Sequence, residues 1–152
     1  EYEKLAKVII EKRKNGDSFN FFHFMIDLDQ GPCAIKRLRG CGCGNEYVSV
    51  TPEGDVYPCH QFVGKKEWIM GSVNDLSLNT EIKDSFAKTT VYTKPECRTC
   101  WAKFYCSGGC NANNLEYAGA IKKPYKLACD LEKKRLECAI MIKAALADLE
   151  IE

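Results

Sequence analysis

Ten cysteines are the residues of this 152-residue chain whose types and spacing could do chemistry, and only two histidines accompany them. Thiolates are soft ligands that hold zinc ions and iron–sulfur clusters. Two ligands on one short loop share a single ordering cost, whereas neighbouring cysteines rarely bridge each other well. Because most of the cysteines are paired tightly, we expect all-sulfur metal sites. The pairs are Cys41/Cys43, Cys97/Cys100 and Cys106/Cys110, and the separate cysteines are Cys33, Cys59, Cys129 and Cys138.

The densest group is a loop with the spacing Cys97-x2-Cys100-x5-Cys106-x3-Cys110. Glycines between its last two cysteines would permit a positive φ and a close approach of the backbone to a bulky cluster. One zinc ion could use the same four thiolates, although a longer arm usually separates structural zinc pairs. An iron–sulfur cube is larger and takes ligands from scattered positions. The loop alone favours a cluster and leaves zinc open.

Two further features extend this pattern. Cys41 is followed by twelve residues, Gly54, four residues and Cys59. Gly54 suits the turn of a β-hairpin over residues 47–57, whose second strand would present Cys59. Cys129 follows Cys110 after a longer interval and stands before an expected terminal helix.

The elements that must position these cysteines follow from apolar periodicity. Residues 1–14 have the period of an amphipathic helix that ends at Asn15-Gly16-Asp17. Residues 19–28 are aromatic and apolar on both faces, which predicts a strand that is covered on both sides. This helix–strand pair predicts the edge of a larger α/β domain, with packing onto the rest of this chain as the alternative.

The remaining elements are short, apart from the last helix. Residues 68–73 predict a further short strand, and Asn79 or Thr80 could cap a helix that turns Ile82 and Phe86 inward. Residues 130–150 predict the longest helix, with an apolar stripe of Leu131, Cys138, Ile142, Ala145 and Leu149. We therefore expect an α+β fold: a small, irregular, metal-pinned domain with a β-hairpin and a terminal helix, preceded by an αβ stub.

The spacing Cys41-x12-Gly54-x4-Cys59, then Cys97-x2-Cys100-x5-Cys106-x3-Cys110, then Cys129 resembles the SPASM domain. This domain carries auxiliary clusters at the C-terminus of many radical S-adenosylmethionine enzymes that modify peptides. The wider segment HFMIDLDQGPCAIKRLRGCGCGNEYVSVTPEGDVYPCHQFVG resembles one branch, the maturases of six-cysteine (SCIFF) peptides, which form thioether crosslinks. The resemblance implies that residues 1–30 are the edge of a radical S-adenosylmethionine partial barrel and that residues 31–152 are the SPASM domain with its terminal helix.

The same resemblance implies two [4Fe–4S] clusters with interleaved ligands. Cys43 is the nearest candidate for the fourth ligand of the first cluster; if it is not one, an open iron could bind a substrate cysteine. The first cluster would be held by Cys41, Cys59 and Cys110, and the second by Cys97, Cys100, Cys106 and Cys129.

The chain lacks the Cys-x3-Cys-x2-Cys loop with which such enzymes cleave S-adenosylmethionine. We therefore expect S-adenosylmethionine and a third cluster only in a separate N-terminal radical domain of the same enzyme. That domain and a cysteine-rich precursor peptide are the expected partners. Whether the chain counts as an enzyme stays open, and we expect it to show no turnover by itself.

Two other readings compete with this one. A zinc-stabilised module that binds a protein or peptide would have no redox role, and zinc could also replace clusters in an aerobic preparation. An extracellular disulfide-rich domain is the other alternative. Outside the predicted ligand sets, Cys138 suits a core position. Cys33 is either a spare loop thiol, or a group near the substrate or a facultative cluster ligand.

Composition narrows the class of partner. The 22 basic and 21 acidic residues leave a net charge of +1, so we expect no nucleic-acid partner. No apolar run approaches the ~20 residues that span a membrane. The start EYEK is not a signal peptide and lacks Met. We therefore expect a fragment of a cytoplasmic protein with reduced thiols.

Overall fold

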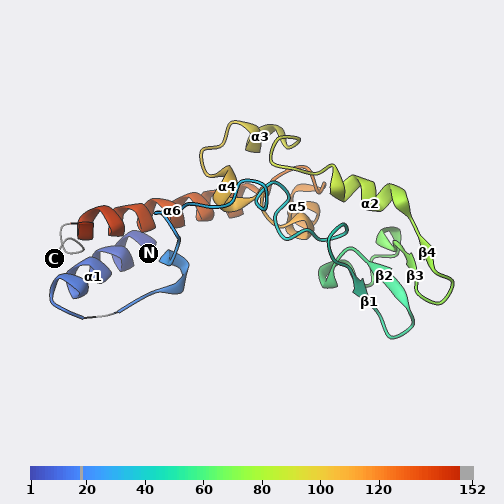
Figure 1. The fold of residues 1–152 in the computed structure, drawn as a ribbon, viewed down its shortest axis with the longest axis horizontal. Helices are drawn as coiled ribbons and strands as arrows, with labels where there is room; N and C mark the ends of the chain where they lie inside the picture. Colours follow the sequence, from blue (N-terminus) through green and yellow to red (C-terminus); the bar gives the residue numbers. More distant parts are fainter. Residues whose placement is uncertain (18, 148–152) are drawn as a thin grey trace. The chain divides into compact units, whose positions relative to one another are not determined.

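The chain is described by a computed structural model that places residues 1–17 and 19–147. It combines helices with a small antiparallel sheet, so the predicted α+β class is confirmed (Figure 1). The chain forms two compact units. The first joins Glu1–Pro32 to the chain from Leu127 onward, and the second is Cys33–Lys126. In the part of the chain that the structure describes, no helix is long and apolar enough to cross a lipid bilayer.

The first unit is built on two helices, α1 (Tyr2–Lys14) and α6 (Lys126–Leu146), which lie side by side (Figure 1). The helix predicted over residues 1–14 is confirmed, and it ends where Gly16 takes a φ of 88°. Lys134 on α6 forms an ion pair with Glu3 on α1 at 2.8 Å. The buried residues of the two helices are Ala6, Ile9, Leu136, Cys138, Ala139 and Leu146.

The strand predicted over residues 19–28 is wrong. The segment holds a single 3-10 turn, η1 (Phe22–Phe24), and no strand. Its rings pack against α1: Tyr2 OH shares a hydrogen bond of 2.6 Å with His23 Nδ1, and the rings of Tyr2 and Phe24 meet edge to face. A strand needs a partner strand for its backbone groups, and the described residues form only one sheet, which lies in the second unit. The assignment of residues 1–30 to a partial barrel stays a prediction.

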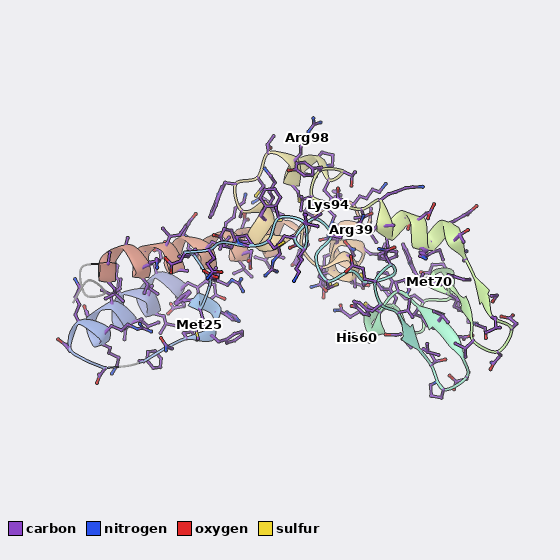
Figure 2. All side chains as sticks on the ribbon, viewed as in Figure 1. Met25, Arg39, His60, Met70, Lys94 and Arg98 are labelled. Carbon is purple, nitrogen blue, oxygen red and sulfur yellow. The ribbon has the colours of Figure 1, made fainter. Side chains whose placement is uncertain are left out.

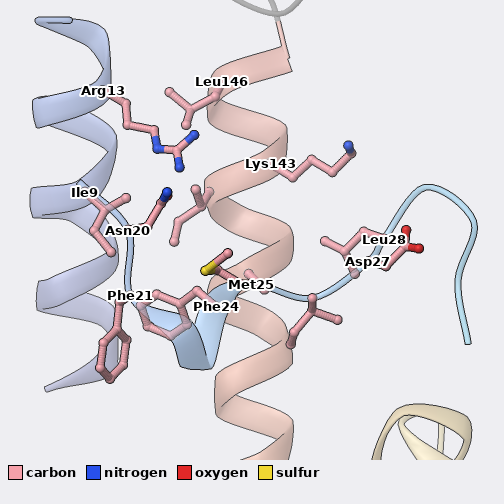
Figure 3. A pocket seen from close by; sticks show the side chains of 13 residues that line it. Ile9, Arg13, Asn20, Phe21, Phe24, Met25, Asp27, Leu28, Lys143 and Leu146 are labelled. Atoms are coloured by element: carbon pink, nitrogen blue, oxygen red, sulfur yellow. The ribbon is translucent and has the colours of Figure 1, made fainter. Parts of the chain in front are cut away.

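This aromatic segment also closes a cavity of about 450 Å³ between α1 and α6 (Figure 3). Arg13 on α1 extends toward Leu146 on α6 at one end of it, and Phe24 and Met25 line the other end (Figure 3). Met25 and the neighbouring Phe22 leave 68% and 72% of their surface exposed. The first unit therefore exposes two large apolar side chains beside this cavity, and exposed apolar groups of this kind are found at sites of protein contact.

The terminal helix is confirmed, but it begins at Lys126, so the prediction that Cys129 precedes it is wrong and Cys129 lies in its first turns. Its buried face also differs in part from the predicted stripe. Cys138 is buried as predicted, whereas Leu131 is 53% exposed. Leu136 and Ala139 are buried instead, because the face that meets α1 is rotated from the predicted one. Leu149 lies outside the described residues.

The second unit contains a four-stranded antiparallel sheet of order β1-β2-β3-β4. The predicted hairpin and the predicted third strand are confirmed. Gly54, with a φ of 95°, closes the hairpin turn by donating its N–H to Thr51 O at 2.9 Å. The fourth strand was not predicted. The strands are β1 (Ser49–Val50), β2 (Asp55–Tyr57), β3 (Gly71–Ser72) and β4 (Ser77–Leu78).

Helix α2 (Thr80–Ala87) follows the sheet and begins at Asn79, whose side chain accepts hydrogen bonds from Glu81 N and Ile82 N, as predicted. Phe86 is buried and meets two aromatic residues of the loop after β2, Phe62 and Trp68, at centroid distances of 5.5 and 5.7 Å. These rings form the core in which Cys43 and Cys59 are packed and which Cys110 contacts. The other helices of this unit are η2 (His60–Phe62), η3 (Lys66–Trp68), α3 (Pro95–Arg98), α4 (Lys103–Cys106) and α5 (Asn111–Ala118).

Candidate metal centre

Four of the predicted ligands are neighbours beside the aromatic core; we call Cys41, Cys43, Cys59 and Cys110 the first cysteine group. Cys41 and Cys59 both lie close enough to the Cys43 thiol to act on its charge. Cys59 likewise lies close enough to Cys41 and Cys110 for their charges to act on it. Cys43 and Cys59 are buried in the core cluster, and Cys110 packs against it. Residues far apart in sequence thus converge at one end of the sheet.

A tight turn brings Cys43 to Cys59. Gly44 N donates to Pro58 O at 2.9 Å and lies within hydrogen-bonding distance of Tyr47 O, so the turn is tied to the end of β2. Gly44 has a φ of 72°, and a Cβ there would lie 2.7 Å from the Phe86 ring. A glycine is therefore required at this position both for the backbone and for the close approach to the core.

Three polar side chains donate to sulfurs of the first cysteine group. Tyr47 OH donates to Cys41 Sγ at 3.7 Å. Asn111 Nδ2 donates to Cys43 Sγ at 3.7 Å, and Gln61 Nε2 donates to Cys110 Sγ at 3.8 Å. Hydrogen bonds to sulfur are a principal means by which proteins stabilise thiolates and set cluster potentials. Sequence reasoning missed all three donors, although each lies within six positions of a predicted ligand.

The surroundings of Cys43, Cys59 and Tyr47 determine whether these side chains are protonated. Burial, with the neighbouring Cys41 thiol, raises the pKa of Cys43 to about 12, and burial also raises the pKa of Cys59. Burial and the hydrogen bond to Cys41 raise the pKa of Tyr47. In the metal-free chain these groups are therefore neutral at neutral pH. A metal centre must displace the thiol protons as it binds.

We call Cys97, Cys100, Cys106 and Cys129 the second cysteine group. Cys97 lies in α3, and Cys100 N donates to Cys97 O at 3.1 Å, so one turn carries both. Cys106 ends α4. These three lie in the second unit, whereas Cys129 belongs to the first. The grouping of all four around one cluster stays a prediction.

The two remaining cysteines have different surroundings. Cys138 is buried on α6, as the core interpretation predicts. Cys33 is exposed, and the backbone N–H of Lys36 lowers its pKa. Like these two, Cys41, Cys43, Cys59, Cys100 and Cys110 are free thiols in this structure.

The donor set fits an iron–sulfur cluster. Across residues 1–17 and 19–147, no three His, Cys, Asp or Glu side chains are arranged to hold a single metal ion. The first cysteine group therefore consists of neighbouring sulfurs and not of a finished coordination sphere. Its ligands are all thiols, and its polar contacts are N–H and O–H donors aimed at sulfur. Such a site suits a soft centre that carries negative charge.

Comparison with known proteins agrees with this chemistry. Residues 41–101 match the model of the SPASM family, an iron–sulfur cluster-binding domain. The matched segment includes the turn of Cys41 and Cys43, the sheet, and Cys59, Cys97 and Cys100. The resemblance to the SPASM domain is thus confirmed for this segment, which supports an iron–sulfur cofactor. No curated protein matches the chain.

Proposed function

We propose that the chain binds two [4Fe–4S] clusters and serves as the auxiliary-cluster domain of a radical S-adenosylmethionine enzyme. The observation that carries this proposal is the convergence of Cys41, Cys43 and Cys59, which lie in the segment that matches the SPASM family, with Cys110, together with donors on three of their sulfurs. When bound, such clusters exchange single electrons at potentials set by their surroundings. This chain's cysteines would hold the clusters, and Tyr47, Asn111 and Gln61 would donate to their sulfurs.

In this proposal Cys43 is the fourth ligand of the first cluster. Two features support this role over that of a spare thiol: Cys43 is buried next to Cys59, and Asn111 donates to its sulfur. A chain that supplied only three thiolates would leave one iron open for a cysteine of the substrate. Cys97, Cys100, Cys106 and Cys129 would hold the second cluster.

The full enzyme would join cysteine thiols to carbon in a cysteine-rich precursor peptide, as SCIFF maturases do. S-adenosylmethionine and a third cluster would bind to an N-terminal radical domain, since the present sequence has no Cys-x3-Cys-x2-Cys loop. The exposed Phe22 and Met25 of the first unit, beside the cavity between α1 and α6, support a contact with such a domain.

The test is metal analysis of the chain after strictly anaerobic purification and reconstitution. We expect about eight irons with matching sulfide per chain, as two four-iron clusters require. Zinc alone, with no iron taken up on reconstitution, would instead support the zinc-stabilised binding module. Addition of S-adenosylmethionine and a cysteine-rich peptide should yield no thioether product, and a product would contradict the need for a separate radical domain.

A further inference from the structure

Lys94 is a lysine in the interior of the second unit. Its side chain is 2% exposed and lies in the region of α4 and α5 (Figure 2). Lysine is almost never fully buried unless its charge is paired, because removing an ammonium from water is costly. The groups around the Lys94 ammonium therefore indicate the role of its charge.

The direct partners of Lys94 are neutral. Nζ donates to Gly108 O at 2.7 Å and to Asn111 Oδ1 at 3.0 Å. Gly108 has a φ of 82°, and a Cβ there would lie 3.2 Å from Lys94 Nζ, so the glycine makes room for the ammonium. Two neutral oxygens solvate the cation but do not neutralise it.

The anions available to Lys94 are thiolates. Four cysteines lie close enough to act on its charge, and they are divided equally between the two cysteine groups: Cys97 and Cys106 from the second, Cys43 and Cys110 from the first. The contact with the first group also runs through a side chain, because the amide that accepts from Lys94 donates through its other end to Cys43 Sγ. One buried cation therefore lies among ligands of both groups.

A four-iron cluster with four thiolates carries net negative charge, which increases when the cluster is reduced. A fixed cation nearby lowers the free energy of the charged centre, and in a site without water this effect is strong. In the metal-free chain burial raises the pKa of Cys43, so its neutral thiol offers the ammonium no such compensation. The arrangement is thus suited to the loaded protein.

We propose that Lys94 is a positioning residue that serves as the shared counter-charge of both auxiliary clusters and, with Asn111, raises their reduction potentials. The proposal rests on the proposed function, since it requires that the two cysteine groups hold clusters. Lys94 is not itself a ligand. Its ammonium acts through the thiolates around it.

The test compares K94M with the wild type after anaerobic reconstitution of the full chain with iron and sulfide. Methionine keeps the length and apolar stem of lysine and removes its charge. We expect both midpoint potentials, followed by electron paramagnetic resonance during redox titration, to shift downward. K88M is the matched control: Lys88 lies on the exposed surface of the same unit, so its removal should leave both potentials unchanged.

Thermal unfolding of the metal-free chain separates the charge of Lys94 from the packing of its stem. K94M keeps the stem and removes an unneutralised buried charge, so its thermal midpoint should stay close to that of the wild type, whereas K94A, which also removes the stem, should lower it. Unchanged potentials in a K94M protein that holds the wild-type amount of iron would overturn the proposal.

Two further outcomes test the role of Lys94 and distinguish its failure from failure of the proposed function. If K94M takes up no iron, K94R is the second variant: iron uptake restored by arginine supports a need for charge, and failure of both variants overturns the proposal in favour of a steric role. If the wild type itself takes up no iron on reconstitution, the proposed function fails and the role of Lys94 fails with it. Wild-type iron content with unshifted potentials overturns only the role of Lys94.

Discussion

The side chain of Asn111 joins a buried thiol to a buried ammonium: its Nδ2 lies 3.7 Å from Cys43 Sγ, and its Oδ1 lies 3.0 Å from Lys94 Nζ. Asn111 is itself only 6% exposed. It also begins α5 directly after Cys110. One amide therefore fixes the relative positions of a predicted ligand, a charge and a helix start.

Asn111→Leu should destabilise the metal-free chain by about 1–3 kcal/mol, because it leaves a buried ammonium with one acceptor fewer. Asn111→Asp should lose less stability, since its carboxylate still accepts from Lys94, but it should release iron faster because a carboxylate cannot donate to the Cys43 sulfur. Thermal unfolding and the rate of iron loss to a chelator measure the two effects. Asn113→Leu, on the same helix, is the control. Equal effects of the leucine variant at both positions would contradict the bridging role.

Alanine substitution of single cysteines should separate ligands from core residues. Cys59→Ala and Cys110→Ala should each lose about four of the eight irons, because each removes a ligand of the first cluster. Cys138→Ala should keep all of the iron and cost about 1 kcal/mol of stability, because this thiol is packed in the core of the first unit. Iron and sulfide assays after reconstitution give the result. Loss of iron from the Cys138 variant would show that α6 supplies a ligand there.

The elements that were predicted correctly are those whose structure depends on local sequence. The helix over residues 1–14 and the cap at Asn79 depend on neighbours within a few positions, and so does the turn at Gly54. The strand expected over residues 19–28 depended on pairing with a distant segment, which no local pattern encodes. Its aromatic residues pack against helices instead.

The candidate site, too, could be predicted only in part from the sequence. Cysteine spacing identified the ligands, because each short loop carries its own pair. It did not identify Lys94 or Asn111, because a lysine and an asparagine in a polar loop are ordinary surface residues until the fold buries them. Tertiary contacts alone give these two residues their partners.

Thiol reactivity in the metal-free chain should differ sharply between two cysteines. Cys33 is exposed and the backbone N–H of Lys36 lowers its pKa, whereas burial raises the pKa of Cys43 to about 12. Only the thiolate is nucleophilic. Cys33 should therefore react first with iodoacetamide near neutral pH, and Cys43 only after unfolding. Peptide mass spectrometry of timed samples measures the order; early labelling of Cys43 would contradict its burial.

The stability of the metal-free chain should fall at alkaline pH. The pKa of Cys43 is raised from 9.0 to about 12 on folding, so the folded chain binds this proton more tightly than the unfolded chain does. The associated stability is present below pH 9 and is lost as the pH rises toward 12. Thermal unfolding between pH 7 and pH 11 should show this loss, with a flatter profile for Cys43→Ala. A thermal midpoint that rises with pH would contradict the expected loss of stability.

Gly71→Ala should damage the sheet that carries Cys59. Gly71 in β3 pairs with Leu78 in β4 and has a φ of 150°, and a Cβ there would lie 2.0 Å from Ser77 O. The new methyl group must push β4 away, so we expect a loss of about 2–4 kcal/mol from backbone strain and displacement. Gly64→Ala is the matched control: Gly64 has a φ of 88° with no atom within 4 Å of the added Cβ, so only strain of about 1 kcal/mol should remain. Chemical unfolding of both variants in the metal-free state compares them. Equal losses would mean that β4 moves freely and that the sheet does not depend on this close contact.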